Sequence, residues 1–255
     1  MSSVEIPAPA APAKTPRPPQ VWKFWGTLLW GLVIFVALFL GQAVVVGFLL
    51  WRRGSFDMAT LNSLLAGGLT LSLSVVAGLP AVLAAIWLAT RAARMDFADY
   101  LALRRPPWKM LLIGVVALAI LVEGWDLVAQ ATGRDVAPGF MGEVLKSARA
   151  DNTLWLLVLA FCVAAPVTEE FFVRGFLYRG WSESFLRPVG AIILSSLVWT
   201  LMHLQYNWFF LGQVFSIGLL LGVLRYYSNS IWLTVILHGL NNLAATIQTM
   251  WLTSS

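Results

Sequence analysis

Long apolar runs, separated by short polar stretches, dominate the hydrophobic pattern of this chain. A helix needs about 20 apolar residues to cross the hydrocarbon core of a bilayer, and seven segments reach that length. These segments are residues 24–51, 61–90, 109–130, 152–178, 188–206, 208–227 and 230–252. The pattern therefore predicts an all-α fold: a polytopic membrane helix bundle with seven transmembrane helices, or eight if a long early segment folds as two.

Two of the stretches between the apolar runs mix polar and apolar residues at helical spacing. Residues 94–109 read "RMDFADYLALRRPPWK" and residues 137–152 read "APGFMGEVLKSARADN". We expect both to form short amphipathic helices at the membrane interface, with Pro106 and Pro107 ending the first. Residues 1–20 hold six of the 12 prolines, a composition that cannot build an apolar core, and we expect a disordered tail without the apolar segment of a signal peptide.

The composition supports a membrane protein. Hydrophobic residues make up 59% of the chain and charged residues only 11%, whereas a soluble domain carries about a quarter charged residues. The net charge of +5 does not call for a nucleic-acid partner, because Lys and Arg flank membrane spans for topological reasons. The expected surroundings are a lipid bilayer.

The distribution of Lys and Arg predicts the orientation of the spans. With the N-terminus inside, 12 of the 17 basic residues fall on the cytoplasmic side, and the five on the other side are Arg52, Arg53, Arg134, Lys146 and Arg149. Positive residues collect in cytoplasmic loops. We therefore predict a multi-pass protein of the cell (inner) membrane with a cytoplasmic N-terminus.

Charged residues occur where they are costly, in "TEEFFVRG" at residues 168–175. A charge at the bilayer centre costs roughly 3 kcal/mol, so these groups need a reason beyond stability. Residues four apart share a helix face, which predicts an ion pair between Glu170 and Arg174. Glu169 lies about 100° further round the helix and is free to face another neighbour.

The two histidines of the chain lie in the same C-terminal group of spans. His238 opens "HGLNN", and the i, i+4 spacing places it on one face with Asn242. His203 and Glu169 lie equally far along the chain from the turn at Leu186, which predicts that they meet at one depth of an antiparallel helix pair. One intramembrane site can therefore contain a specific set of polar residues: Glu169, Glu170, Arg174, His203, His238 and Asn242.

Such a set can hydrolyse a peptide bond. A glutamate and a histidine across a cavity can hold and deprotonate a water molecule, while His238 and Asn242 can donate hydrogen bonds to the resulting oxyanion. Two histidines and a glutamate also form a known zinc constellation, so Glu169, His203 and His238 are candidate ligands of zinc or another divalent metal. The sequence leaves the metal-bound and the metal-free water both open.

Structural explanations exist for each residue taken singly. An intramembrane histidine can simply hydrogen-bond two helices, a Glu–Arg pair can pin helices together, and a Glu–His chain can relay protons in a transporter. Glu123 and Asp126, three residues apart, are expected to lie on a solvated interfacial face and not in a second site. The matched depths and spacings of the six residues favour a joint function.

The three motifs resemble those of a known family. "EEFFVR" resembles the EExxxR motif of the CPBP family, which comprises CAAX prenyl endopeptidases and bacteriocin-processing (Abi) proteases. "WTLMH" is similar to the FxxxH motif, with Trp199 where Phe is usual, and "HGLNN" matches HxxxN. The motifs appear in order over roughly residues 150–250, and the first 150 residues show no matching motif.

The resemblance implies a role for each residue of the candidate site. It implies that Glu169 and His203 activate water, that Glu170 and Arg174 support them, and that His238 and Asn242 form the oxyanion hole. The family is usually labelled a metalloprotease, although a metal-free mechanism has also been argued for it. The implied substrate is a membrane-associated protein or peptide, and the alternative is a catalytically silent scaffold that binds partner membrane proteins.

The expected organisation of the chain is a tail (1–20), N-terminal transmembrane helices (21–150) and a catalytic helix core (151–255).

Overall fold

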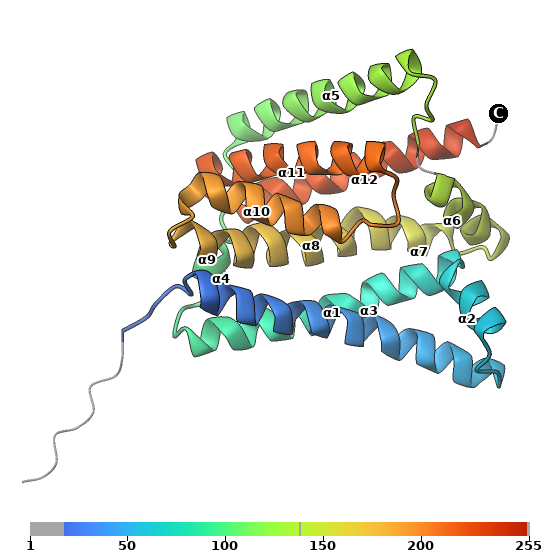
Figure 1. Cartoon of the computed structure of the whole chain (residues 1–255), viewed down its shortest axis with the longest axis horizontal. Coiled ribbons are helices and arrows are strands. Elements are labelled where there is room, and N and C mark those ends of the chain that lie inside the picture. The colour runs from blue at the N-terminus through green and yellow to red at the C-terminus, as the bar shows by residue number, and fades with distance from the viewer. Residues whose placement is uncertain (1–17, 138, 254–255) are drawn as a thin grey trace, which may run out of the picture.

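The computed structural model describes residues 18–137 and 139–253, and these residues form a bundle of helices (Figure 1). The structure is 81% helical, and no strand occurs among the described residues. This confirms the all-α fold. The predicted disordered tail lies outside the described residues except for its last three positions.

Each of the seven predicted spans corresponds to a helix or a continuous run of helical segments. The helices are α1 (Phe24–Arg53), α3 (Gly68–Ala92), α5 (Trp108–Ala131), the run Leu154–Ser182, α10 (Arg187–Leu201), α11 (Trp208–Ser228) and α12 (Ile231–Leu252). Among the described helices, five are long and apolar enough to cross a membrane: α1, α3, α5, Leu154–Ser182 and α11. The chain is therefore an integral membrane protein. The count of seven is not confirmed, because α10 has only 15 residues and α12 is not among the five.

Three shorter helices connect the long ones. They are α2 (Met58–Leu65), α4 (Phe97–Leu101) and α6 (Gly139–Ala150). The last two lie within the predicted amphipathic segments. The prolines do not end α4 as predicted, because it already ends at Leu101 and is followed by Ala102 with a left-handed φ of 56°. The predicted span 61–90 was too long at its start, because Gly67 separates α2 from α3.

The long helices lie side by side in layers. Figure 1 shows α1 and α3 together on one side of the molecule, α5 on the opposite side, and the remaining helices between them. Two glycines bring α1 and α3 close: a Cβ atom on Gly41 would lie 2.9 Å from the Ala77 carbonyl oxygen, and one on Gly78 would lie 2.8 Å from Leu38 Cδ1. Small residues at such crossings are how membrane helices approach one another.

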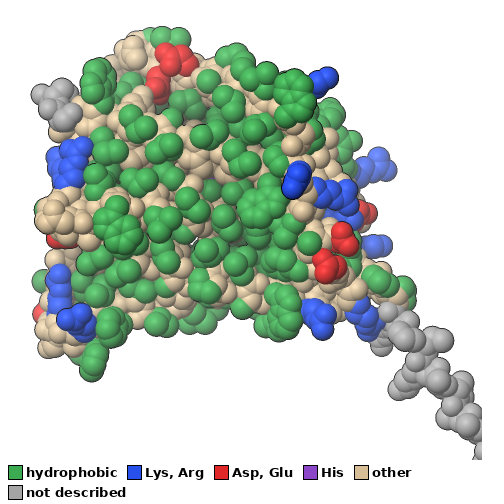
Figure 2. Space-filling view, turned by 180° about the vertical axis from the view of Figure 1, so that it is seen from behind, with side chains coloured by type: hydrophobic (Ala, Val, Ile, Leu, Met, Phe, Trp, Pro, Cys, Tyr) green, Lys and Arg blue, Asp and Glu red, His purple; other side chains and the backbone are tan. Residues whose placement is uncertain are grey.

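The surface shows the pattern of a membrane protein. Figure 2 shows that Lys, Arg, Asp and Glu side chains gather mostly at two opposite edges, with hydrophobic side chains over the belt between them. Large apolar residues such as Leu29, Val36, Leu40 and Val44 of α1 are more than half exposed. A bilayer around this belt would solvate these side chains, and the charged edges would face the interfaces.

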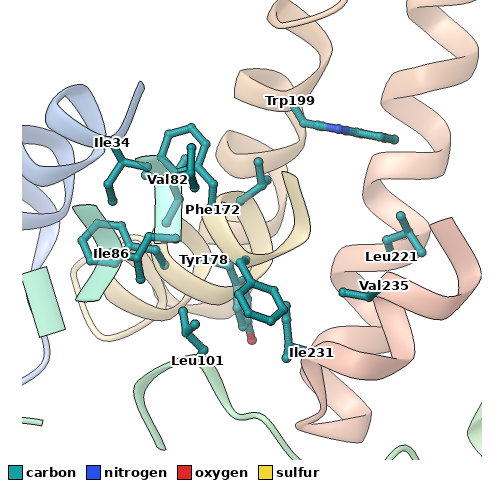
Figure 3. Close-up of a cluster of buried hydrophobic side chains, with 14 of the residues drawn as sticks. Ile34, Val82, Ile86, Leu101, Phe172, Tyr178, Trp199, Leu221, Ile231 and Val235 are labelled. Atoms are coloured by element: carbon teal, nitrogen blue, oxygen red, sulfur yellow. The ribbon is translucent and has the colours of Figure 1, made fainter. Parts of the chain in front are cut away.

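The run Leu154–Ser182 is the central element of the bundle. Its segments are α7 (Leu154–Leu159), η1 (Ala160–Ala164), α8 (Ala165–Glu170), η2 (Phe171–Leu177) and α9 (Tyr178–Ser182), and the two η segments are π-helical. Every residue of η2 is buried. Figure 3 shows apolar side chains from several helices around Phe172 and Tyr178, among them Ile34, Val82, Leu101 and Ile231.

Candidate active site

The central helix is π-helical in η1, just before α8, which carries Pro166 and the two glutamates. In η1 the Ala165 N–H bonds to the Ala160 carbonyl, five residues back. The next carbonyl in that pattern, Phe161, would pair with residue 166, but proline has no N–H. Helix α12 supplies the missing donor, because Asn242 Nδ2 donates to the Phe161 carbonyl at 2.9 Å. Asn242 is therefore fixed by an irregularity in the neighbouring helix.

Gly239 allows α12 to approach this part of the central helix. A Cβ atom at Gly239 would lie 2.7 Å from the Cys162 carbonyl oxygen, a contact with backbone that cannot move aside cheaply. The glycine of "HGLNN" is thus required for close packing, although the sequence interpretation assigned it no role. A glycine between the His and the Asn of a helical motif is the signal that could have indicated this close approach.

Glu170 and Arg174 form the predicted ion pair and are both fully buried. Arg174 Nη1 lies 2.8 Å from Glu170 Oε1, and Arg174 Nη2 donates to the Gly218 carbonyl of α11 at 3.2 Å. His238 Nδ1 lies 3.0 Å from the same Glu170 oxygen. Because a carboxylate only accepts hydrogen bonds, Nδ1 of His238 carries the hydrogen. Glu170 therefore links the central helix to α12, a contact that the sequence did not indicate.

Glu169 points to a different set of neighbours, as its position on the helix predicts. Its Oε2 accepts a hydrogen bond from Trp199 Nε1 at 2.5 Å and lies 4.0 Å from His203 Nε2. Glu169 and His203 thus meet, as their equal distances from Leu186 along the chain predicted. His203 itself lies in the turn after α10, which ends at Leu201 and not near residue 206 as the hydrophobic pattern predicted.

The tautomer of His203 follows from its other contact. His203 Nδ1 lies 2.9 Å from the Trp199 carbonyl oxygen. A carbonyl can only accept, so Nδ1 donates, and in the neutral ring Nε2 has a free lone pair. The nitrogen that faces Glu169 is therefore a hydrogen-bond acceptor, as the Glu169 carboxylate is.

A cavity of about 870 Å³ opens among the helices at this point. Residues of the predicted set that line it are Glu169, His203, His238 and Asn242; its apolar wall includes Phe35, Leu38, Val75, Val115 and Leu118. Glu170 and Arg174 are not among the lining residues. The two adjacent glutamates thus have separate surroundings: Glu169 faces the cavity, and Glu170 lies behind its wall.

Two further acidic side chains line this cavity, Glu123 and Asp126, and this was not expected. Asp126 lines the cavity, is buried, and accepts a hydrogen bond from Gln248 Nε2 at 2.6 Å. The prediction of a solvated face is wrong for Asp126, although Glu123 is exposed. Because Asp126 and Gln248 lie 122 residues apart, no local pattern around either residue could have shown the contact.

The predicted metal ligands do not form a metal centre in this arrangement. Among residues 18–137 and 139–253, no group of three His, Cys, Asp or Glu side chains could hold a metal ion. Glu169 and His203 lie within 4.0 Å of one another, and the Nδ1–H of His238 donates to Glu170. The three side chains are thus not grouped as the ligands of a three-ligand zinc site, and no step below is derived through a metal.

Comparisons with known proteins agree with the motifs. Residues 151–244 match the family model described as "Type II CAAX prenyl endopeptidase Rce1-like". An Escherichia coli protein described as "Uncharacterized 24.3 kDa protein" is 30% identical over 135 residues, which cover 52% of this chain and 58% of that protein. The chain therefore spans little more than half the length of that relative. No solved structure gives a significant match.

The matched segment contains all three motifs and the cavity-lining residues Glu169, His203, His238 and Asn242. The family model is that of a protease family, and the match covers the part of the chain where the motif resemblance was found. The resemblance of this part of the chain to the CPBP family is thereby confirmed over residues 151–244.

Proposed function

We propose that this protein is an intramembrane endopeptidase, in which Glu169 and His203 activate the water that hydrolyses a peptide bond. The observation that carries the proposal is the meeting of the Glu169 carboxylate and His203 Nε2 at the wall of a cavity inside the helix bundle. The match of residues 151–244 to the model of a protease family supports the same activity.

The geometry suits a water molecule between the two side chains. Both the carboxylate and the neutral Nε2 atom accept hydrogen bonds, and the 4.0 Å between them is close to the gap that one bridging water fills. A water there donates both its hydrogens to the protein. Its lone pairs then point away from Glu169 and His203, toward a substrate carbonyl in the cavity.

Hydrolysis then proceeds in two steps that balance in atoms and charge. The water oxygen bonds to the carbonyl carbon, Glu169 takes a proton from that water, and the carbonyl oxygen becomes an oxyanion. The oxyanion re-forms the carbonyl as the C–N bond breaks, and Glu169 returns its proton to the departing amine. The products are a carboxylic acid and an amine, and Glu169 is again a carboxylate.

Asn242 and His238 are the proposed oxyanion donors. Asn242 Nδ2 uses one of its two hydrogens on the Phe161 carbonyl, and the second remains for the substrate. His238 Nδ1–H bonds to Glu170, so its Nε2 can donate to an oxyanion only from a doubly protonated ring. The Glu170 carboxylate lies in position to offset that charge, which gives Glu170 and Arg174 an electrostatic role behind the cavity wall.

The proposed substrate is a membrane-associated protein or peptide. The cavity lies among apolar helices and has apolar walls, so a segment that reaches Glu169 must leave bulk water. We place the protein in the cell (inner) membrane with the end that carries α4 and α9 in the cytoplasm. That end carries Arg94, Arg104 and Arg179, in agreement with the positive residues of cytoplasmic loops.

A reconstituted assay tests the activity. Purified wild type and Glu169→Gln are placed in liposomes with membrane-protein substrates, and new peptide termini are measured with and without 1,10-phenanthroline. Glu123→Gln is the matched control, because Glu123 also lines the cavity but has no part in the proposed chemistry. We expect cleavage by wild type and Glu123→Gln, none by Glu169→Gln, and no effect of the chelator.

Two results would change the proposal in different ways. Loss of cleavage on chelation, restored by added zinc, would replace the metal-free water by a metal-bound one. Equal behaviour of wild type and Glu169→Gln, both folded, would leave the alternative of a catalytically silent scaffold that binds partner membrane proteins.

A further inference from the structure

Trp199 lies at the centre of the candidate active site and contacts four of its residues. The indole Nε1–H donates to Glu169 Oε2, and the guanidinium carbon of Arg174 lies 4.4 Å from the ring centroid. The ring centroids of His203 and His238 each lie 5.2 Å from that of Trp199. In Figure 3 the indole extends from its own helix toward the neighbouring helix, apart from most of the other labelled side chains.

The electrostatics of an indole ring suit this position. The face of an aromatic ring is negative and its edge is positive; Arg174 lies over the ring, and the Glu169 carboxylate meets the N–H at its edge. One side chain therefore holds a cation and an anion by opposite parts of its charge distribution. The ring is 3% exposed, so water competes little for either contact.

Gly218 of α11 makes room for the ring. A Cβ atom at Gly218 would lie 3.2 Å from Trp199 Cε3 and 3.0 Å from Ser196 Cβ, so a side chain there would crowd the indole. The Gly218 carbonyl also accepts from Arg174. The close approach of α11 thus supports the ring and its cation together.

The usual residue at this motif position is Phe, which has a ring but no hydrogen-bond donor. The indole N–H and its bond to Glu169 are therefore specific to a chain with Trp here. Oε2 of Glu169 accepts that bond and also faces His203, whereas Oε1 makes no hydrogen bond to the residues that the structure describes. The two carboxylate oxygens have different surroundings.

We propose that Trp199 is the positioning residue of Glu169: its N–H holds Oε2, the oxygen that faces His203 Nε2, in place to accept the proton of the bridging water. This assignment rests on the proposed function. It differs from a purely structural role, in which the ring fills space between helices and a Phe would serve as well. A carboxylate that is not held can rotate out of line with the water, and small misplacements of a reacting group are costly in rate.

The kinetic test compares two substitutions that each remove one indole N–H. Trp199→Phe keeps the ring and removes the donor. Trp181→Phe is the matched control, because Trp181 is also buried but its Nε1 has no hydrogen-bond partner among the described residues. The probe is an internally quenched peptide with a farnesylated cysteine, assayed with detergent-solubilised full-length protein. We expect kcat to fall about 10-fold in Trp199→Phe with KM within about twofold, and neither to change in Trp181→Phe.

A second measurement needs no substrate. In a double-mutant cycle, the Tm of detergent-solubilised protein is measured for wild type, Trp199→Phe, Glu169→Ala and the double variant. We expect Trp199→Phe to lower the Tm by about 2–4 °C when Glu169 is present and by less than half as much when it is absent. Equal shifts in both backgrounds, or an unchanged kcat in a Trp199→Phe enzyme that cleaves the probe, would overturn the assignment.

The two measurements separate this inference from the proposed function. If wild type fails to cleave the farnesylated peptide, that result counts against the peptide as substrate, and the thermal cycle alone decides whether Trp199 holds Glu169. If Glu169→Ala cleaves as fast as wild type, the proposed function fails, whatever the cycle shows.

Discussion

Two helices of nearly equal length, α1 and the run Leu154–Ser182, have opposite surroundings. They have 30 and 29 residues, and both are apolar enough to cross a membrane. In the most apolar window of α1 only 11% of the residues are buried inside the protein, against 56% in the run Leu154–Ser182. Hydropathy thus identifies both as spans, but it does not show which one lies at the centre of the bundle.

The polar residues distinguish the two helices. Charged residues of α1 lie in its last turn, at Arg52 and Arg53, whereas Glu169, Glu170 and Arg174 lie within the central helix. Each of these three has a partner on its own or another helix. A helix that faces lipid needs only apolar side chains, whereas an internal helix can carry charges if its neighbours satisfy them.

The largest expected effect is the loss of the buried cation. Arg174→Met leaves Glu170 buried without its main counter-charge, and removal of one partner of a buried pair costs about 3–5 kcal/mol. We expect a strong drop in thermal stability in detergent and in the amount of protein in membranes. The double variant Glu170→Gln/Arg174→Met should regain part of the loss; a single variant with wild-type stability would contradict the burial of an ionised pair.

The next effect is on turnover. Asn242→Ala removes a proposed oxyanion donor, and the loss of one such donor costs about 10²–10³ in kcat. The matched control is Gln248→Ala, which removes another amide from the same helix and cavity and should keep kcat within a few-fold. If Asn242→Ala raises KM and leaves kcat unchanged, Asn242 binds substrate and does not stabilise the transition state.

A smaller effect is expected from two equivalent glycine substitutions. Gly239→Ala places a methyl group 2.7 Å from the Cys162 carbonyl oxygen and should destabilise the protein by about 1–3 kcal/mol through overpacking. Gly47→Ala in α1 meets no atom within 4 Å and should be neutral or stabilising, because alanine favours a helix. Thermal unfolding of both variants in the same detergent measures the two losses of stability. Equal losses would mean that α1 is packed as closely at Gly47 as α12 is at Gly239.

The smallest effect belongs to the lipid-facing surface of α1. Leu32 is 55% exposed, and we expect Leu32→Ala to change the free energy of unfolding by less than about 0.5 kcal/mol. The same thermal measurement applies. A loss above about 2 kcal/mol would show that this face is covered by another helix or protein and not by lipid.

The fold class and part of the candidate site could be predicted from local rules. Apolar length identified every long helix, the i, i+4 rule identified the Glu170–Arg174 pair, and equal chain distance from Leu186 identified the approach of Glu169 and His203. Each rule depends only on helix geometry, which the sequence sets directly. Roles in catalysis are not tested by these contacts and stay proposals.

The remaining contacts depend on how distant helices pack. The bond between Glu170 and His238 joins residues 68 apart, and that between Asp126 and Gln248 joins residues still further apart. The hydrophobic pattern assumes regular α-helices, so it also could not predict the π-helical segments or the early end of α10 at Leu201. The sequence shows a proline three residues before the glutamate pair. It does not show that Asn242 donates to the Phe161 carbonyl, because that contact depends on where α12 packs.

The central claim is that Glu169 takes a proton from the water that cleaves a peptide bond. Its most direct test is proteomics of N- and C-terminal peptides on membranes that express wild type or Glu169→Gln at equal levels. We predict new termini that occur only with wild type, and these would also identify the substrate. The same termini with both proteins, or none with either while both are folded among the host's natural membrane proteins, would contradict the claim.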